Sequence, residues 1–331
     1  PTTGSSSYSV QTVVSTTNNG EVGTQIVPTG DLDGDGLEDL LVSAPKSRNF
    51  EAEVLGAGAS YVYLASSFSE ASDAMGDADM IIYGQTRTAY ASTAAGTLGD
   101  LDGDGFPELF VGEPKGDGDW SNDAGNVYIF QSCPQGIGGC WDMDGDGNSD
   151  VMSAWGPGSY VEVEDADAIL SGSATDDYVG SAVTAVPDLY GDGSSALVVG
   201  ASGISTVYLI DGYPFASTRI DSAADTVLLG AETPESGGAG TSLANAGDLN
   251  ADGYTDLLIG APGEAADAGR VYVVFGRSQV DFDAFGGTLE LATWADSEFT
   301  GENSGDAAGT AISGIGDQNL DGCDDFIIGA P

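Results

Sequence analysis

The chain has 331 residues, 41% of them hydrophobic, so it can bury a sizeable core as two ordinary domains or as one large β architecture. Seven lysines and arginines face 53 aspartates and glutamates, and the net charge of −46 argues against unaided binding to nucleic acid or to an anionic membrane surface. The chain has no histidine, which removes Ser-His and Cys-His catalytic pairs, and we expect no enzyme activity. A glycosidase-type carboxylate pair is the remaining catalytic alternative.

Short apolar groups separated by Gly, Asp, Ser and Asn predict many short strands, and no apolar run is long enough for a transmembrane segment. In chain order, the first four predicted strands are residues 22–30, 38–45, 59–65 and 77–84. A later set of four is predicted at residues 239–247, 255–262, 269–276 and 286–293.

One segment repeats along the chain. GDLDGDGLEDLLVSAP at residues 30–45 recurs in related form at residues 99–114, 187–202, 247–262 and 316–331. Eight residues before each first aspartate stands a small residue: Gly23, Ser92, Gly180, Gly240 or Gly309. The repeat length of roughly sixty to seventy residues suits four strands and their turns. We therefore predict an all-β fold, a β-propeller of four-stranded antiparallel blades with calcium-binding loops, forming one domain over residues 1–331 with five units. A β-solenoid would need a shorter repeat.

The spacing between the second and third units is longer because of an insertion, residues 132–160. It contains CPQGIGGC, and we expect a disulfide between Cys133 and Cys140, which would place the protein outside the cytosol, secreted or at the cell surface. The insertion is either a decorated hairpin or an abbreviated blade. Cys323 remains, as a buried thiol or an intermolecular link.

The last unit reaches residue 331 after its second strand, and residues 8–14 (YSVQTVV) are expected to supply an outer strand to it. For the remaining strand, two possibilities stay open. Either the natural protein continues, or another chain adds a strand at the blade edge, which would make the protein self-associating.

The repeated acidic loop follows the pattern Asp-x-Asp-x-Asp-Gly-x-x-Asp. Carboxylates at positions 1, 3 and 5 converge, Gly at 6 permits the turn, the carbonyl of 7 adds an oxygen and an acid at 9 can bind through both oxygens. Hard oxygen ligands in this number select Ca2+. The predicted ligands of about five sites are Asp31, Asp33, Asp35, Leu37, Asp39; Asp100, Asp102, Asp104, Phe106, Glu108; Asp142, Asp144, Asp146, Asn148, Asp150; Asp248, Asn250, Asp252, Tyr254, Asp256; and Asp317, Asn319, Asp321, Cys323, Asp325.

The loop in the third unit departs from this pattern. It has Tyr190 at position 3 and Ala196 at position 9, beside Asp188 and Asp192, and we predict that it binds no metal. An EF-hand is excluded because position 12 carries strand residues such as Val42 instead of glutamate. The plain alternative for every loop is a solvated acidic turn.

These loops, together with the Gly-Ala-Pro at residues 260–262 and 329–331, resemble the FG-GAP repeats of the integrin α-subunit propeller. The resemblance implies an extracellular propeller that holds calcium on one face and binds partners on the other. We therefore expect a calcium-stabilised extracellular or cell-surface propeller that mediates adhesion, protein–protein interaction or self-assembly through a blade edge or a propeller face. The alternative is a lectin-like, calcium-dependent carbohydrate binder that stacks sugars on Trp120, Trp141, Trp155 or Trp294.

Overall fold

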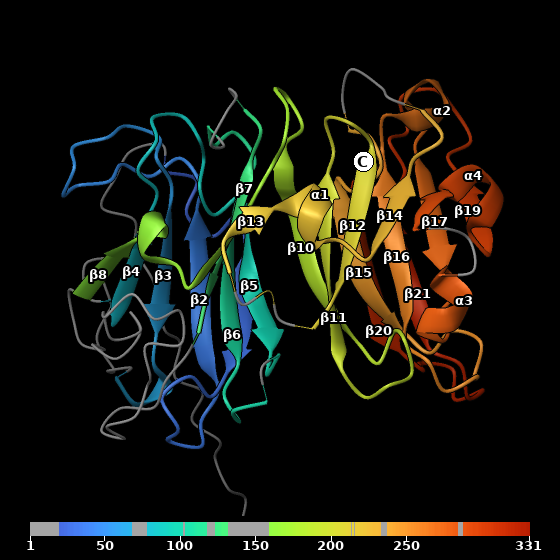
Figure 1. Ribbon diagram of the computed structural model, residues 1–331, viewed down its shortest axis with the longest axis horizontal. Helices are drawn as coiled ribbons and strands as arrows, with labels where there is room; N and C mark the ends of the chain where they lie inside the picture. The colour runs from blue at the N-terminus through green and yellow to red at the C-terminus, as the bar shows by residue number, and fades with distance from the viewer. Residues whose placement is uncertain are drawn as a thin grey trace, which may run out of the picture.

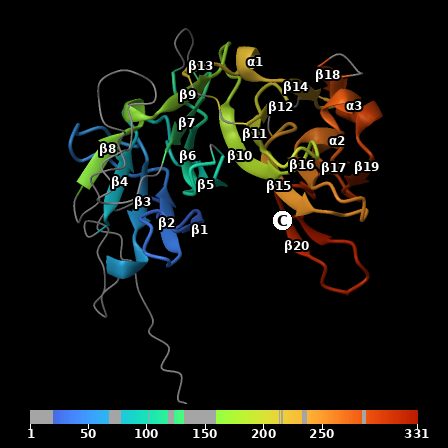
Figure 2. The ribbon, with the colours of Figure 1, turned by 60° about the horizontal axis from the view of Figure 1, so that its bottom comes forward.

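The computed structural model describes residues 20–67, 78–101, 103–117, 123–131, 159–212, 214, 216–232, 237–283 and 287–331. Within these residues the strands form five sheets, which stand around a common axis as the blades of a β-propeller (Figures 1 and 2). The predicted all-β propeller fold is confirmed. In Figure 2 the blades follow an arc, with β1 and β20 at its two ends.

Each blade is built from antiparallel strands that follow one another in chain order. Blade 1 contains β1 (Ile26–Gly30), β2 (Asp39–Ala44), β3 (Ala59–Tyr63) and β4 (Met80–Tyr83). Blade 2 contains β5 (Ala94–Gly99), β6 (Glu108–Glu113), β7 (Asn126–Phe130) and β9 (Ala168–Ser171). Blade 3 contains β10 (Val179–Pro187), β11 (Ser195–Ala201), β12 (Thr206–Asp211) and β14 (Thr226–Leu229). Blade 4 contains β15 (Ser242–Gly247), β16 (Asp256–Ala261), β17 (Arg270–Val274) and β19 (Ser297–Thr300), and the described part of blade 5 contains β20 (Ala311–Gly316) and β21 (Asp325–Gly329).

Three blades gain a fifth strand from the next blade. β8 (Ser159–Glu162) pairs in parallel with β4, β13 (Thr218–Arg219) with β9, and β18 (Thr288–Glu290) with β14. Each of these strands lies between the third and fourth strands of its own unit, so it links adjacent blades. One predicted strand is therefore wrong: residues 286–293 do not form the fourth strand of blade 4, because β18 crosses to blade 3 and β19 takes that place.

A single helical turn follows each linking strand and fixes it to the core. These turns are η4 (Val163–Asp165), α1 (Ile220–Ala223) and α4 (Leu291–Trp294). Their first residues, Val163, Ile220 and Leu291, are at most 1% exposed. Among the described residues the other short helices are η1 (Ala65–Ser67), α2 (Glu264–Asp267) and α3 (Gln279–Asp283).

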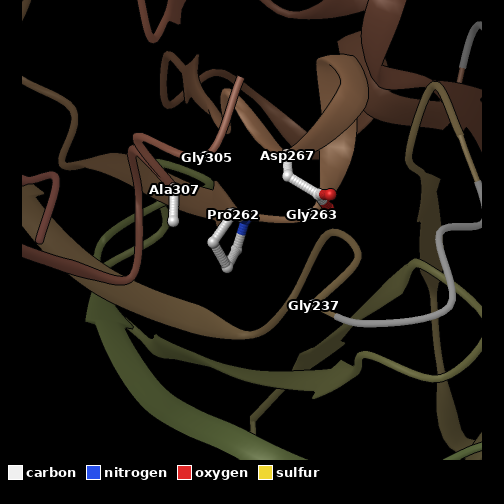
Figure 3. Close-up of a pocket in the computed structure, with 6 residues that line it drawn as sticks. All are labelled: Gly237, Pro262, Gly263, Asp267, Gly305 and Ala307. Atoms are coloured by element: carbon white, nitrogen blue, oxygen red, sulfur yellow. The ribbon is translucent and has the colours of Figure 1, made fainter. Parts of the chain in front are cut away.

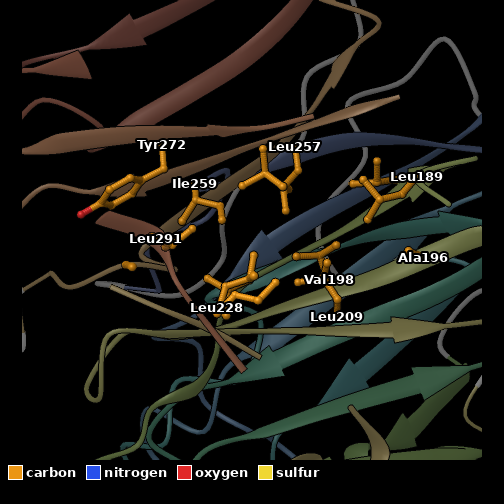
Figure 4. Close-up of a cluster of buried hydrophobic side chains, with 14 of the residues drawn as sticks. Leu189, Ala196, Val198, Leu209, Leu228, Leu257, Ile259, Tyr272 and Leu291 are labelled. Atoms are coloured by element: carbon orange, nitrogen blue, oxygen red, sulfur yellow. The ribbon is translucent and has the colours of Figure 1, made fainter. Parts of the chain in front are cut away.

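The core lies between blades, because successive side chains of a strand point to opposite faces and both faces of an inner blade are covered. In β11, Val198 packs toward blade 4 and Val199 toward blade 2. Figure 4 shows the cluster between blades 3 and 4, where Leu209 and Leu228 meet Ile259. This double burial explains why the strands read as continuous apolar runs.

Glycines at fixed positions let the blades approach at backbone distance. A Cβ on Gly200 would lie 2.1 Å from the carbonyl oxygen of Gly240 in the next blade. Gly240 itself has φ +88°, and Ser92 occupies the same register position with φ +72°. The small-residue position seen in the sequence therefore marks a left-handed backbone at each blade junction.

Candidate metal sites and the opposite face

The first acidic loop connects β1 to β2 and gathers three carboxylates. Oxygens of Asp31, Asp33 and Asp39 all lie within 4.8 Å of one another. Asp31 is fixed by the turn, because its Oδ1 accepts the Asp35 N–H at 3.0 Å and its Oδ2 accepts the Gly36 N–H at 2.8 Å. The loop thus holds its acids in a converging arrangement that hard cations favour.

The acid at position 9 is buried at the root of the loop. Asp39, Glu108 and Asp256 are at most 1% exposed. One oxygen of Asp39 accepts the Leu32 N–H and one oxygen of Asp256 accepts the Leu249 N–H, both at 2.8 Å. Burial is the main cause that raises the pKa of Asp39, and it raises the pKa of Asp256 to about 6. A cation in the loop would favour the charged carboxylates and lower these pKa values.

The same turn recurs in the other acidic loops. The position-1 carboxylate accepts the N–H of position 6 at 2.8 to 3.0 Å in all five described loops, through Asp31, Asp100, Asp188, Asp248 and Asp317. The position-5 carboxylate accepts the N–H of position 7 at 2.8 to 3.0 Å in all five, in the pairs Asp35 with Leu37, Asp104 with Phe106, Asp192 with Ser194, Asp252 with Tyr254 and Asp321 with Cys323. Asn250 and Asn319 use their side-chain oxygens as Asp33 does, each accepting the N–H of position 5 at 2.9 Å. Asp325 accepts the Gln318 N–H at 2.9 Å.

The third loop is filled by an aromatic contact. Tyr190, at position 3, is only 4% exposed, and its ring meets that of Phe282 edge-on with centroids 5.0 Å apart. Ala196, at position 9, is fully buried. Phe282 comes from α3 of blade 4, so an interblade contact takes the place of the Asp or Asn that the other loops carry at position 3. Sequence reasoning identified the missing ligands but not the ring that replaces them.

Several predicted sites lie outside the described residues. They are Asp102, the sixth motif (Asp142, Asp144, Asp146, Asn148, Asp150), the Cys133–Cys140 pair, residues 8–14, and Trp120, Trp141 and Trp155. Cys323 is a free, partly buried thiol. Trp294 packs against the core between blades 3 and 4, with its ring 5.2 Å from Phe282 and 4.7 Å from the Arg277 guanidinium. Trp294 therefore packs in the protein core, which is the alternative to stacking on a sugar ring.

A second repeated aspartate was missed by the sequence reasoning. It stands just before the fourth strand of a blade and accepts the N–H that follows the third strand, at 2.7 to 2.9 Å; the four examples are Asp79, Asp167, Asp225 and Asp296. Its signal is the Ala-Asp dipeptide that precedes each fourth strand. These aspartates therefore cap a backbone N–H at the turn between the third and fourth strands.

The face opposite the acidic loops carries two buried glutamates near the third strands of blades 2 and 4. Glu264 accepts a hydrogen bond from the Tyr272 hydroxyl and lies 3.8 Å from the Arg270 guanidinium. Glu113 accepts one from the Tyr128 hydroxyl at 2.8 Å, and its Oε1 has no hydrogen-bond partner within the described part of the chain. Burial raises the pKa of Glu113 to about 7.

The same face has a shallow hollow at blade 4. It has a volume of about 290 Å³ and is lined by Gly237, Pro262, Gly263, Asp267, Gly305 and Ala307 (Figure 3). Three successive residues of its wall, Ala265 to Asp267, have φ between +54° and +62°. Hydrogen bonds from the Gly305 and Ala307 amides to the Asp267 carbonyl hold this left-handed turn in place.

Comparison with known proteins identifies FG-GAP repeats at residues 22–63, 92–130 and 239–274. The chain is similar to integrin alpha-5 of Xenopus laevis, with 31% identity over 186 residues, which is 56% of this chain and 15% of the relative. It is also similar to integrin alpha-3 of Mus musculus (33% over 107 residues, 32% of this chain and 9% of the relative) and to integrin alpha-PS2 of Drosophila melanogaster (35% over 111 residues, 33% and 8%). The matches thus span a small part of these relatives. No helix among the described residues is long and apolar enough to cross a membrane.

Proposed function

We propose that this chain, whose FG-GAP repeats form an integrin α-like β-propeller, is a calcium-stabilised extracellular or cell-surface module that mediates protein interaction. In this proposal residues 1–331 act as one domain that carries the 132–160 insertion. The observation that carries the calcium proposal is the convergence of Asp31, Asp33 and Asp39 within 4.8 Å.

The donor set fits calcium better than a transition metal. The acidic loops offer carboxylates, amide oxygens and a backbone carbonyl, and these oxygen donors suit Ca2+. Asp39 is buried, so its ionised form is costly unless a cation or hydrogen bonds compensate for it. The first, second, fourth and fifth loops and the sixth motif would each hold one ion, and the third loop none.

The role of the metal in this proposal is structural. Each ion would fix the turn between the first two strands of a blade, and binding that requires the folded loop adds to the free energy of unfolding. The similarity to integrin α subunits supports a role in protein interaction outside the cell, rather than catalysis.

Thermal melting of the purified chain, in calcium and in chelator, tests this proposal. At a calcium concentration of about 100 times Kd, each site adds about 2.7 kcal/mol to the free energy of unfolding. Asp35→Asn should reduce the calcium-dependent rise in Tm, because it removes a charged ligand from position 5 of the first loop. Asp192→Asn is the matched control in the third loop and should leave that rise unchanged. A wild-type Tm that does not respond to calcium would contradict the proposal.

A further inference from the structure

The few lysines and arginines of this acidic chain are unevenly distributed. Four of its seven lysines and arginines, Lys46, Arg48, Arg87 and Lys115, lie in the connections that follow β2, β4 and β6. Because the strands of a blade alternate in direction, these connections share the face opposite the acidic loops. The first of them is the blue loop at the upper left of Figure 1. A molecule with a net charge of −46 thus concentrates most of its positive charge on one face of blades 1 and 2.

Three of these connections meet around one tyrosine. The Lys46 and Lys115 ammonium groups lie 6.0 and 5.6 Å from the centre of the Tyr90 ring. Tyr90 has φ +57°, a left-handed backbone that is uncommon for a large side chain. Two positive charges from different connections therefore lie near the same aromatic ring.

The repeat itself indicates that the fold does not require this cluster. Where blades 1 and 2 have lysine after the second strand, blades 3 and 4 have Gly203 and Gly263. At the position of Tyr90, the junction between blades 4 and 5 has Ala307, also with positive φ. Glycine takes the place of the lysines in blades 3 and 4, so the backbone does not require the lysines. Tyr90 recurs as Tyr178 at the junction between blades 2 and 3, with φ +54°, so the lysines are what distinguishes this junction.

Apolar side chains stand beside the cations. Phe50 and Leu55 are 49% and 54% exposed, on a small loop closed by the bridge between Asn49 and Val54. The Arg48 guanidinium lies 6.0 Å from the Phe50 ring centre. Exposed aromatic residues next to arginine are enriched in protein interfaces.

The local ion pairs leave charge available for a partner. Lys46 pairs with Glu21 at 2.6 Å and Arg48 with Glu53 at 3.7 Å, and both pairs are exposed, so each is weak and exchangeable. Arg87 and Lys115 are exposed, and no acidic group lies within ion-pair distance of either in the portion of the chain that the structure describes.

We propose that this basic-aromatic patch, formed by Lys46, Arg48, Phe50, Arg87, Tyr90 and Lys115, docks an acidic peptide segment of a protein partner that also carries an apolar side chain. Carboxylates of the segment would pair with the lysines and arginines, while its apolar side chain would contact Phe50. The inference rests on the proposed role in protein interaction and adds the residues that bind and the chemistry of the partner.

The test is fluorescence polarisation of a labelled glutamate-rich peptide with a central leucine, titrated with the calcium-saturated chain at physiological salt. The same peptide with lysine in place of each glutamate is the negative probe. Lys115→Gln should weaken binding of the acidic peptide about two- to fivefold, the range of one exposed ion pair. Arg219→Gln is the matched control, since Arg219 is an exposed arginine at the outer edge of blade 2, and it should leave the affinity unchanged.

Any of three other results would overturn the inference. Equal affinity for the acidic and basic peptides would show that the patch has no preference for carboxylates. An equal loss in Lys115→Gln and Arg219→Gln would show an effect of overall charge alone. Competition by polygalacturonate at lower concentration than by the unlabelled peptide would assign the patch to acidic polysaccharide instead. The melting experiment does not depend on the patch, so failure of calcium stabilisation and failure of peptide docking are separately visible.

Discussion

Glu113 is predicted to make the chain less stable as pH rises toward neutrality. Its carboxyl group is 1% exposed at the end of β6, and it accepts a hydrogen bond from the Tyr128 hydroxyl. Burial disfavours the charged form and raises the pKa of Glu113 from 4.5 in the unfolded chain to about 7. The folded state therefore holds a proton that the unfolded state releases between about pH 4.5 and pH 7, and the free energy of unfolding falls across that window.

The size of the effect follows from the shift. Each pKa unit is worth about 1.4 kcal/mol, so ionisation of Glu113 costs about 3 kcal/mol at pH 7 and above. Glu113→Gln keeps an acceptor for the Tyr128 hydroxyl and removes the charge. We expect the variant to match wild type near pH 4.5 and to exceed its free energy of unfolding by up to about 3 kcal/mol at pH 7 and above.

The assay is urea unfolding of both proteins at saturating calcium over that pH range, and the quantity of interest is the difference between them. Glu264→Gln is the contrasting variant, because Glu264 lies 3.8 Å from the Arg270 guanidinium and its loss should destabilise the chain at neutral pH. A difference between wild type and Glu113→Gln that stays constant from about pH 4.5 to pH 8 would refute the reasoning.

Three further substitutions test packing and backbone, each by urea unfolding. Tyr190→Ala should cost about 3–5 kcal/mol, because it empties the space that an aromatic ring fills in the third loop, and a loss below about 1 kcal/mol would contradict that contact. Asp79→Ala should lower the free energy of unfolding by about 1–3 kcal/mol, because it leaves the buried Leu64 N–H without its acceptor. Asp225→Ala removes the equivalent but exposed acceptor and should lower it less. Equal losses in the two variants would count against burial as the reason. Gly269→Ala should cost more than Gly253→Ala, since both have positive φ but only at Gly269 would a Cβ lie 2.2 Å from backbone atoms of the next connection.

Much of the fold could be read from the sequence, because a repeat imposes the same local pattern on every unit. The predicted strands at 22–30, 38–45, 59–65 and 77–84 contain β1 to β4. The acidic loops predicted from spacing alone form matching turns, since the Asx hydrogen bonds and the left-handed glycine that shape them are interactions within nine residues.

The strand at 286–293 was placed in the wrong blade for a reason that local pattern does not contain. Its apolar residues suit a strand, but whether they complete their own blade or extend the previous one depends on which sheet edge lies nearest in space. Tyr190 is a similar case, because its sequence position marks the loss of a ligand, while only the fold brings Phe282 to it.

The sequence by itself determined the repeated motif, most of the strands around it and the positions of the acidic loops, because each of these depends on neighbours along the chain. The tertiary structure alone decided which connections extend the adjacent blade, that Glu113 is buried, and that Lys46 and Lys115 both lie near Tyr90. These contacts join residues far apart in the sequence, and their energies depend on burial and distance, which arise only when the blades pack together.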